Sequence, residues 1–220
     1  MKILSLKGSP RGRGNSTIMM NNFIRGCEES GADINIFSPD DLDINPCRGC
    51  LRCNLLKRCS IRGDDWPELS NMILNSDVIV ISSPVYFFNF PSELKKIIDR
   101  FRSFIEVRIT ENGLIHTPWA EWSKKFVLLL SMGSPDPKEG KNIADMMKFI
   151  VEELGDKNEI FTFYGTRLAV SGQIEFPLEK LETLYEKLEI PVECAEHDFK
   201  KNSGLLKEIY DLGENIASGK

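Results

Sequence analysis

The chain has 220 residues, of which 41% are hydrophobic and 28% are charged, values typical of a globular protein with a sizeable core. The formal net charge of −5 argues against bulk binding to nucleic acid or to an anionic membrane. The apolar run at the N-terminus is too short for a signal peptide, and no stretch approaches transmembrane length. We therefore expect a cytoplasmic protein whose thiols are reduced.

Short apolar runs alternate with helical patterns along the chain. The runs predict five strands, at residues 2–7, 32–37, 77–83, 125–131 and 159–164. Helical patterns begin at Ser16 and end near Gly26, and others cover residues 66–75, 94–104 and 143–151. Strands that alternate with helices predict an α/β fold with a doubly wound five-stranded parallel sheet. The expected order is 2-1-3-4-5, flavodoxin-like, with the ligand at the carboxyl ends of the strands.

Two regions exceed this minimal fold. Residues 106–123 form an excursion that contains two tryptophans and His116. Beyond about Thr166, two polar amphipathic helices are expected near 178–188 and 203–217. We therefore divide the chain into a flavodoxin-like domain at 1–165, which includes a cysteine-rich loop at 43–63 after the second strand, and a helical extension at 166–220. This extension is expected to pack on the domain or on a partner subunit.

The cysteine-rich loop holds four of the six cysteines within 13 residues, at the spacing C-x2-C-x2-C-x5-C. They are Cys47, Cys50, Cys53 and Cys59. Thiolates are soft ligands that suit iron–sulfur clusters, zinc and cuprous copper. A compact run of this kind favours an iron–sulfur cluster, whereas structural zinc sites more often use two separated C-x2-C pairs. Free reduced thiols remain the third interpretation.

The loop after the first strand, residues 8–17, combines glycines, hydroxyls and arginines and opens a helix. Close backbone approach, exposed N–H groups and the helix dipole make such a loop a phosphate cradle. It matches neither G-x-G-x-x-G nor a Walker loop. The alternative is a plain turn between strand and helix, with Asn15 or Ser16 as the N-cap.

Two further loops follow predicted strands. Residues 83–89 are rich in aromatics and could hold the backbone beside a flat ring, or could form a hydrophobic turn that buries Phe87 and Phe88 against a helix or a second chain. Residues 131–134 either complete a pocket or form a turn. All three loops should emerge at one edge of the sheet, and this convergence favours a shared binding site.

Three motifs, in this order, resemble the NADPH-dependent FMN reductase superfamily. They are Gly8-Ser-Pro-Arg…Asn-Ser-Thr17, the cysteine run followed by Asp64-Asp65, and Ser83-Pro-Val-Tyr…Pro91…Asp99-Arg100. The compact cysteine motif resembles the iron–sulfur flavoprotein branch. The resemblance covers roughly residues 1–135. It implies a flavodoxin-like fold that binds FMN, a [4Fe–4S] cluster, and assembly into homodimers or homotetramers.

The resemblance also implies roles for individual residues. The FMN phosphate would be held by Ser9, Arg11, Asn15, Ser16 and Thr17. The isoalloxazine would lie along Pro84, Val85, Tyr86, Phe87, Phe88 and Asn89. Met132 and Gly133 would bound the other side of the ring, and the four cysteines of the loop would ligate the cluster. No catalytic side chain is expected, and no second flavin loop can be identified near Tyr164-Gly165-Thr166.

The leading hypothesis is a flavin-dependent oxidoreductase that passes electrons from NAD(P)H or a ferredoxin-type carrier, through FMN and the cluster, to a small-molecule acceptor. A second hypothesis is a cluster-free NAD(P)H:FMN or quinone reductase. A third is a non-enzymatic electron carrier or redox sensor. The basic residues of the cysteine loop, among them Lys57, Arg58 and Arg62, either face solvent, offset an anionic cluster or steer an acidic carrier.

Overall fold

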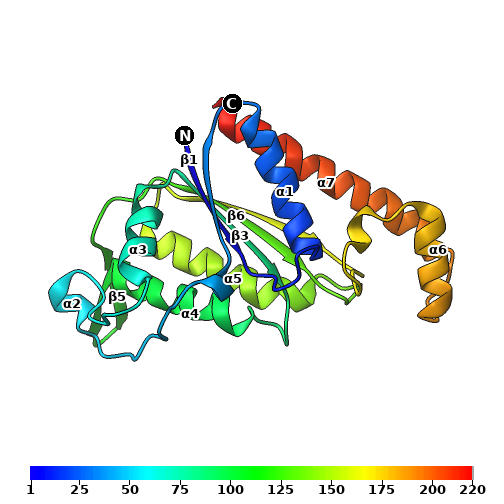
Figure 1. The fold of residues 1–220 in the computed structure, drawn as a ribbon. Coiled ribbons are helices and arrows are strands. Elements are labelled where there is room, and N and C mark those ends of the chain that lie inside the picture. The colour runs from blue at the N-terminus through cyan, green and yellow to red at the C-terminus, as the bar shows by residue number, and fades with distance from the viewer. Residues whose placement is uncertain (220) are drawn as a thin grey trace.

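The computed structural model describes residues 1–219 and contains a five-stranded parallel sheet with helices on both faces (Figure 1). Its strands are β1 (Lys2–Lys7), β2 (Asp33–Phe37), β3 (Val78–Pro84), β6 (Lys125–Ser131) and β7 (Glu159–Gly165). They lie in the order β2-β1-β3-β6-β7, and every neighbouring pair is parallel. This is the predicted order 2-1-3-4-5, so the flavodoxin-like fold is confirmed.

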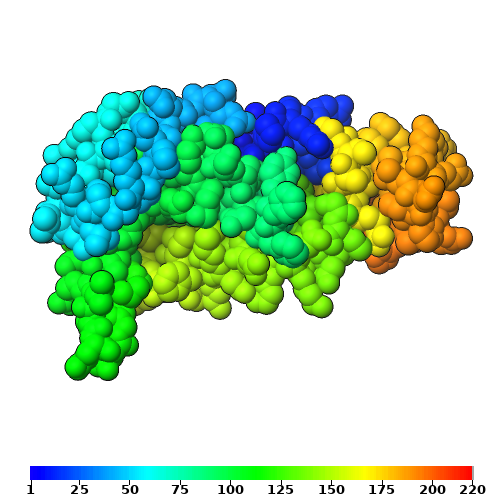
Figure 2. All heavy atoms as spheres, turned by 90° about the horizontal axis from the view of Figure 1, so that it is seen from below, coloured from blue at the N-terminus to red at the C-terminus, as the bar shows by residue number. Residues whose placement is uncertain are grey.

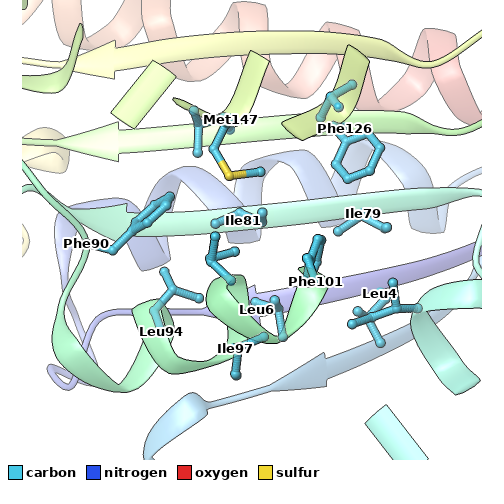
Figure 3. Packing of buried hydrophobic residues seen from close by; sticks show 14 of the residues in the cluster. Leu4, Leu6, Ile79, Ile81, Phe90, Leu94, Ile97, Phe101, Phe126 and Met147 are labelled. Atoms are coloured by element: carbon cyan, nitrogen blue, oxygen red, sulfur yellow. The ribbon is translucent and has the colours of Figure 1, made fainter. Parts of the chain in front are cut away.

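The apolar runs form strands because both faces of the sheet are covered. Successive side chains of a strand point to opposite faces. Leu4 and Ile79 therefore belong to one core cluster, while Ile3 and Val80 belong to the other. Figure 3 shows the first cluster, in which side chains of the sheet meet Leu94, Ile97 and Phe101 of the neighbouring helical segments.

The helices form two layers. One layer consists of α1 (Asn15–Glu28) and α7 (Cys194–Ser218). The other consists of α3 (Trp66–Asn75), α4 (Ser92–Arg100) and α5 (Lys138–Leu154). The remaining helical segments are short: η1 (Pro39–Asp41), α2 (Cys53–Leu56), η2 (Phe101–Phe104), η3 (Gln173–Glu175) and α6 (Leu178–Lys187). Of the described helices, none is both long and apolar enough to cross a membrane.

Helix α1 does not end at Gly26, as the sequence pattern suggests, but continues to Glu28. Gly26 lies where α1 crosses α7, and a Cβ there would stand 2.3 Å from the carbonyl oxygen of Tyr210. Gly213 of α7 is in the same position towards α1, because its Cβ would stand 2.3 Å from the Phe23 carbonyl oxygen. The two glycines therefore permit close helix packing.

The excursion at 106–123 contains a hairpin whose strands are not among those predicted. Strands β4 (Ile105–Thr110) and β5 (Gly113–Pro118) pair antiparallel and are not part of the main sheet. Figure 2 shows this green segment projecting from the body. In the tail, α6 agrees with its predicted bounds, whereas α7 begins at Cys194 rather than near residue 203. The proposed division at residue 165 stays a prediction.

Candidate functional site

The three predicted loops line one cavity of about 150 Å³. It lies at the carboxyl ends of β1, β3 and β6, because each loop follows directly after its strand. Eight of the thirteen predicted flavin residues line it: Ser9, Arg11, Asn15, Pro84, Val85, Tyr86, Met132 and Gly133. Hydrogen bonds between backbone groups hold the loops in place relative to one another. The Val85 N–H donates to the Ser131 carbonyl over 2.9 Å.

The start of α1 has the properties of an anion site. Its N-cap is Gly14, no side chain caps it, and its first-turn N–H groups have no intrahelical acceptor. The hydroxyls of Ser16 and Thr17 are buried and have no hydrogen-bond partner. Polar groups rarely stay buried without a partner. A ligand with several acceptor oxygens, such as a phosphate, would satisfy both sets of donors.

Gly14 allows the loop to close over this helix start. A Cβ at Gly14 would stand 2.2 Å from the Ser9 hydroxyl oxygen. The Gly14 N–H donates to the Arg11 carbonyl, and the Arg11 N–H donates to the Ser9 hydroxyl. Any larger residue at Gly14 would therefore displace Ser9 from the cavity wall.

Asn15 lines the cavity, and its side chain also forms hydrogen bonds within the protein. Its side-chain amide donates to the Val170 carbonyl over 2.9 Å and accepts from the Ile174 N–H over 3.1 Å. These bonds hold the segment after β7 against the cavity, where Leu168 and Ala169 become part of the wall. The Asn15 side chain therefore joins the start of α1 to the segment after β7.

The sequence did not identify this fourth wall. The segment after β7 lacks a glycine-rich pattern, and its placement depends on partners more than 150 positions away in the chain. The Met132 carbonyl accepts from the Leu168 N–H over 2.9 Å, and the Arg167 N–H donates to the Ser134 carbonyl over 2.8 Å. The only local signal was Gly165, where a Cβ would stand 2.7 Å from the Leu168 side chain.

The aromatic loop forms a tight two-residue turn. Tyr86 and Asn89 exchange both backbone hydrogen bonds over 2.9 Å, with Phe87 and Phe88 between them at φ angles of 47° and 62°. Bulky residues rarely adopt positive φ, and Phe87 is 99% exposed. The structure therefore contradicts a turn that buries these rings within the chain. Phe87, Phe88 and Asn89 do not line the cavity but stand outside it.

The four cysteines of the loop line a second cavity, together with Arg100, Arg102 and Ser103. Cys53 is buried, Cys50 is exposed, and the other two are half-buried. Among residues 1–219, no group of three or more His, Cys, Asp or Glu side chains is placed to hold a single metal ion. All four cysteines nevertheless line one small cavity of about 30 Å³, and four thiols are a donor set of the kind that soft metal centres use.

A buried ion pair closes the neck of the cysteine loop. Arg100 and Asp64 have fully buried side chains, and their Nη1 and Oδ2 atoms are 2.7 Å apart. Arg100 Nη1 also donates to the Asn45 carbonyl, and Asp64 Oδ2 accepts from the Asn45 N–H. The two ends of the loop are thus held together. Nε and Nη2 of Arg100 have no partner.

These contacts shift the ionisation of the groups involved. Burial alone would raise the pKa of Asp64, but hydrogen bonds from Arg100 and the Asn45 N–H outweigh it and hold the pKa below its usual value. Burial raises the pKa of the Cys53 thiol. A hydrogen bond with Ser60 lowers the pKa of Cys50. Arg102 Nη1 lies 3.5 Å from the Cys53 sulfur, within a network that also includes Asn54.

The two cavities lie apart within one chain. They share no lining residue. In Figures 1 and 2 the cysteine loop and α2 occupy one end of the molecule, and α4 lies between them and the loop that precedes α1. Within one chain, the cavity at the strand ends and the cysteine cavity are therefore not neighbours.

Known proteins resemble this chain in sequence. The family model described as NADPH-dependent FMN reductase matches residues 1–155. An iron–sulfur flavoprotein of Archaeoglobus fulgidus is 34% identical over 215 residues, which covers 98% of this chain and 81% of that protein. An iron–sulfur flavoprotein of Methanocaldococcus jannaschii is 35% identical over 102 residues. This second match spans 46% of the chain and only about half, 52%, of that relative's length.

Solved structures share the fold at low identity. The NAD(P)H:quinone oxidoreductase from Methanothermobacter marburgensis has a TM-score of 0.64 at 18% identity, with 98% of each chain covered. An FMN-dependent NADH-azoreductase from Bacillus anthracis has a TM-score of 0.61 at 15% identity, covering 98% of this chain and 99% of that one. The family match and the nearly full-length relative confirm the predicted class of flavin-dependent oxidoreductases. The chain belongs to the NADPH-dependent FMN reductase family, and its relatives include iron–sulfur flavoproteins.

Proposed function

We propose that the chain binds FMN at the cavity between the ends of β1, β3, β6 and β7 and passes electrons from a reduced donor to an acceptor. The observation that carries this proposal is the uncapped start of α1, with the partnerless hydroxyls of Ser16 and Thr17, at the edge of the cavity. FMN supplies the redox chemistry when bound, since it accepts a hydride or single electrons. The protein supplies binding, orientation and electrostatics.

Each wall has a distinct part in binding. The first-turn N–H groups of α1, with Ser9 and the charge of Arg11, would hold the phosphate. The Val85–Tyr86 backbone and the turn that follows would lie along the ring system, and Met132 with Gly133 would bound it on the other side. The cavity of about 150 Å³ is smaller than typical ligand pockets. It would therefore enclose only part of the cofactor.

We further propose that Cys47, Cys50, Cys53 and Cys59 hold a [4Fe–4S] cluster. The chemistry of four thiols around one cavity supports this, as do the names of the relatives. Arg100 and Arg102 line the same cavity, and their positive charges would favour an anionic centre. The Asp64–Arg100 ion pair, which joins the two ends of the cysteine loop, would help to hold the four sulfurs in place.

The chain is also expected to form a homodimer or homotetramer. The turn at Phe87–Phe88 presents two exposed aromatic rings beside the flavin cavity, and Leu55 of the cysteine loop is 87% exposed. Large exposed apolar side chains of this kind mark contact surfaces. Because the two cavities are separated within one chain, contact between copies is the simplest way for them to approach each other.

A cluster-free NAD(P)H-dependent reductase is the second candidate. One observation favours it: no single-ion site is formed by the cysteines within the described residues. In that case the loop at 43–63 would be structural, held by its neck contacts alone.

Anaerobic purification tests both candidates. Iron, sulfide and FMN are counted, and the absorption spectrum is recorded before and after addition of NADH, NADPH or a reduced ferredoxin. We expect flavin bands above a broad shoulder, with iron and sulfide in equal amounts. A yellow, iron-free protein reduced by NAD(P)H would support the second candidate. A colourless protein that takes up no FMN would refute both.

A further inference from the structure

A cavity of about 340 Å³ lies beside the cysteine loop, and neither the flavin nor the cluster proposal uses it. Its walls come from the end of the loop, from α3, from η2 and from the segment that follows β5. Its volume is within the range of pockets that bind small organic molecules.

The rim of this cavity is cationic. Lys57, Arg58 and Arg62 line it, and no Asp or Glu is among the lining residues. None of the three forms an ion pair with a carboxylate of residues 1–219. Their charges are therefore not neutralised within the described chain, and they would attract an anionic group.

The interior of the cavity is aromatic and rigid. Trp66 and Phe104 are 2% and 5% exposed, and their ring centroids are 5.5 Å apart. Trp119 also lines the cavity, and its backbone N–H donates to the Phe104 carbonyl over 2.9 Å. Lys57 Nζ stands 5.7 Å from the Trp119 ring centroid. Because Trp66 and Phe104 are almost fully covered, a flat apolar body would find most of its aromatic contact at the half-buried Trp119, beside the edges of the other two rings.

One wall is shared with the cysteine cavity. Cys59 and Ser103 line both spaces. The Ser103 hydroxyl is held in place by the Trp66 indole N–H, which donates to it over 3.2 Å. A molecule bound in the cationic cavity would therefore contact the same cysteine that lines the thiol site.

We propose that this cavity binds a planar aromatic carboxylate, with its ring system against Trp66, Phe104 and Trp119 and its carboxylate at Lys57, Arg58 and Arg62. Binding itself does not depend on the flavin proposal. The bound molecule would lie beside a redox centre only if Cys59 holds the cluster, and this part of the inference rests on the proposed function. A small molecule is favoured over an acidic protein because the three cations stand around a cavity of about 340 Å³ with aromatic side chains in its walls.

The test compares 2-naphthoate with its neutral isostere 2-naphthamide by titration calorimetry on the FMN-loaded protein. We expect the carboxylate to bind about fivefold or more tightly than the amide, and less tightly as salt is raised. The double variant Arg58→Gln/Arg62→Gln should lose that preference for the carboxylate and keep its affinity for the amide.

A charge-matched control is Arg108→Gln/Lys187→Gln, since both residues are exposed and lie outside the cavity. It should bind 2-naphthoate as the unaltered protein does. Equal affinities for the two probes, or an equal loss in both double variants, would overturn the inference. If 2-naphthoate does not bind but Arg58→Gln/Arg62→Gln slows reduction by a ferredoxin, the cations serve a protein partner and the inference is wrong. Iron counted on the same sample separates this outcome from failure of the cluster proposal.

Discussion

At the scale of single residues, the flavin cavity depends on one glycine more than on any charged side chain. Gly14 lies so close to Ser9 that a Cβ would stand 2.2 Å from the hydroxyl oxygen. A Cβ at Gly12, in the same loop, would have nothing within 4 Å, and the φ of Gly12 is not positive. Substitution of Gly14 therefore tests close packing, and substitution of Gly12 tests the effect of a less flexible loop backbone.

Gly14→Ala is expected to weaken FMN binding by about tenfold or more, which corresponds to about 1.4 kcal/mol. The added methyl group would push Ser9 and the Arg11 backbone away from the helix start. Titration of the apoprotein with FMN, followed by quenching of flavin fluorescence, measures the effect. Gly12→Ala should bind FMN within about twofold of the unaltered protein, and an equal loss in both variants would contradict the cradle geometry.

The Asp64–Arg100 pair should dominate the stability of the cysteine loop. Arg100→Gln leaves the buried Asp64 carboxylate without its cation, and breaking such a pair costs about 3–5 kcal/mol. Urea unfolding at neutral pH measures the loss. Lys141→Gln breaks the exposed pair with Asp145 and should cost less than about 1 kcal/mol. Similar losses in both variants would show that the buried pair has no special role.

The Asp64–Arg100 pair should also make the free energy of unfolding fall at acid pH. Because the pKa of Asp64 is held below its unfolded value, of about 3.9, its contribution is complete above that value and is lost as pH falls through the folded pKa. Unfolding free energy should therefore fall steeply below about pH 4. Asp64→Asn should be less stable at neutral pH but should show a smaller fall in acid, and an unchanged acid slope would contradict this assignment.

At the scale of elements, the layer of α1 and α7 places the phosphate site. Helix α1 carries the proposed anion site at its uncapped first turn, and its other end is held by close contact with α7. Cys27 donates to the Gly213 carbonyl over 3.4 Å, and burial raises the pKa of that thiol to about 12. Cys27 is therefore a packing residue and stays protonated at neutral pH.

Two glycines of α7 test this packing. Gly213→Ala would place a Cβ 2.3 Å from the Phe23 carbonyl oxygen, and overpacking of this kind costs about 1–3 kcal/mol. Gly204→Ala meets nothing within 4 Å and should stabilise the helix by up to about 1 kcal/mol. Thermal unfolding should thus shift in opposite directions. Stabilisation by both substitutions would refute close packing at this crossing.

The elements that could be predicted from the sequence are those whose pattern is local. The strand at 125–131 appears with its expected bounds because its apolar run alone determines burial on both faces. Gly26 looks like a helix end because glycine often ends helices. Its actual role, close approach to Tyr210, involves a residue far along the chain and has no local signal.

The β4–β5 hairpin does carry a local signal, since Ile105, Val107 and Ile109 alternate with polar residues before Asn112-Gly113. Its place outside the alternation of parallel strands and helices is what has no counterpart in the predicted fold.

The same distinction holds for the site. Ser9, Arg11 and Tyr86 could be predicted because each follows its own strand at the ligand-binding edge. Leu168 and Ala169 could not, since the bond that the Leu168 carbonyl accepts from Asn15 and the bond that the Leu168 N–H donates to the Met132 carbonyl bring them to the cavity. The separation of the two cavities also has no sequence signal, because it depends on how the loop at 43–63 crosses the molecule.

At the scale of the whole molecule, the two proposed cofactor sites and a cationic cavity are arranged around one sheet. The flavin cavity lies at the carboxyl edge of the strands, while the thiol and cationic cavities adjoin each other through Cys59 and Ser103. This arrangement separates flavin chemistry from the cysteine loop within a chain. The turn at Phe87–Phe88, which follows the cavity-lining Tyr86, stays exposed.

A crystal structure of the protein with FMN tests the central claim most directly. We predict that the phosphate accepts hydrogen bonds from the Ser16 and Thr17 backbone N–H groups and from their hydroxyls, with the ring system along Val85 and Tyr86. FMN bound elsewhere on the chain, or a phosphate that leaves the first turn of α1 without contact, would contradict it.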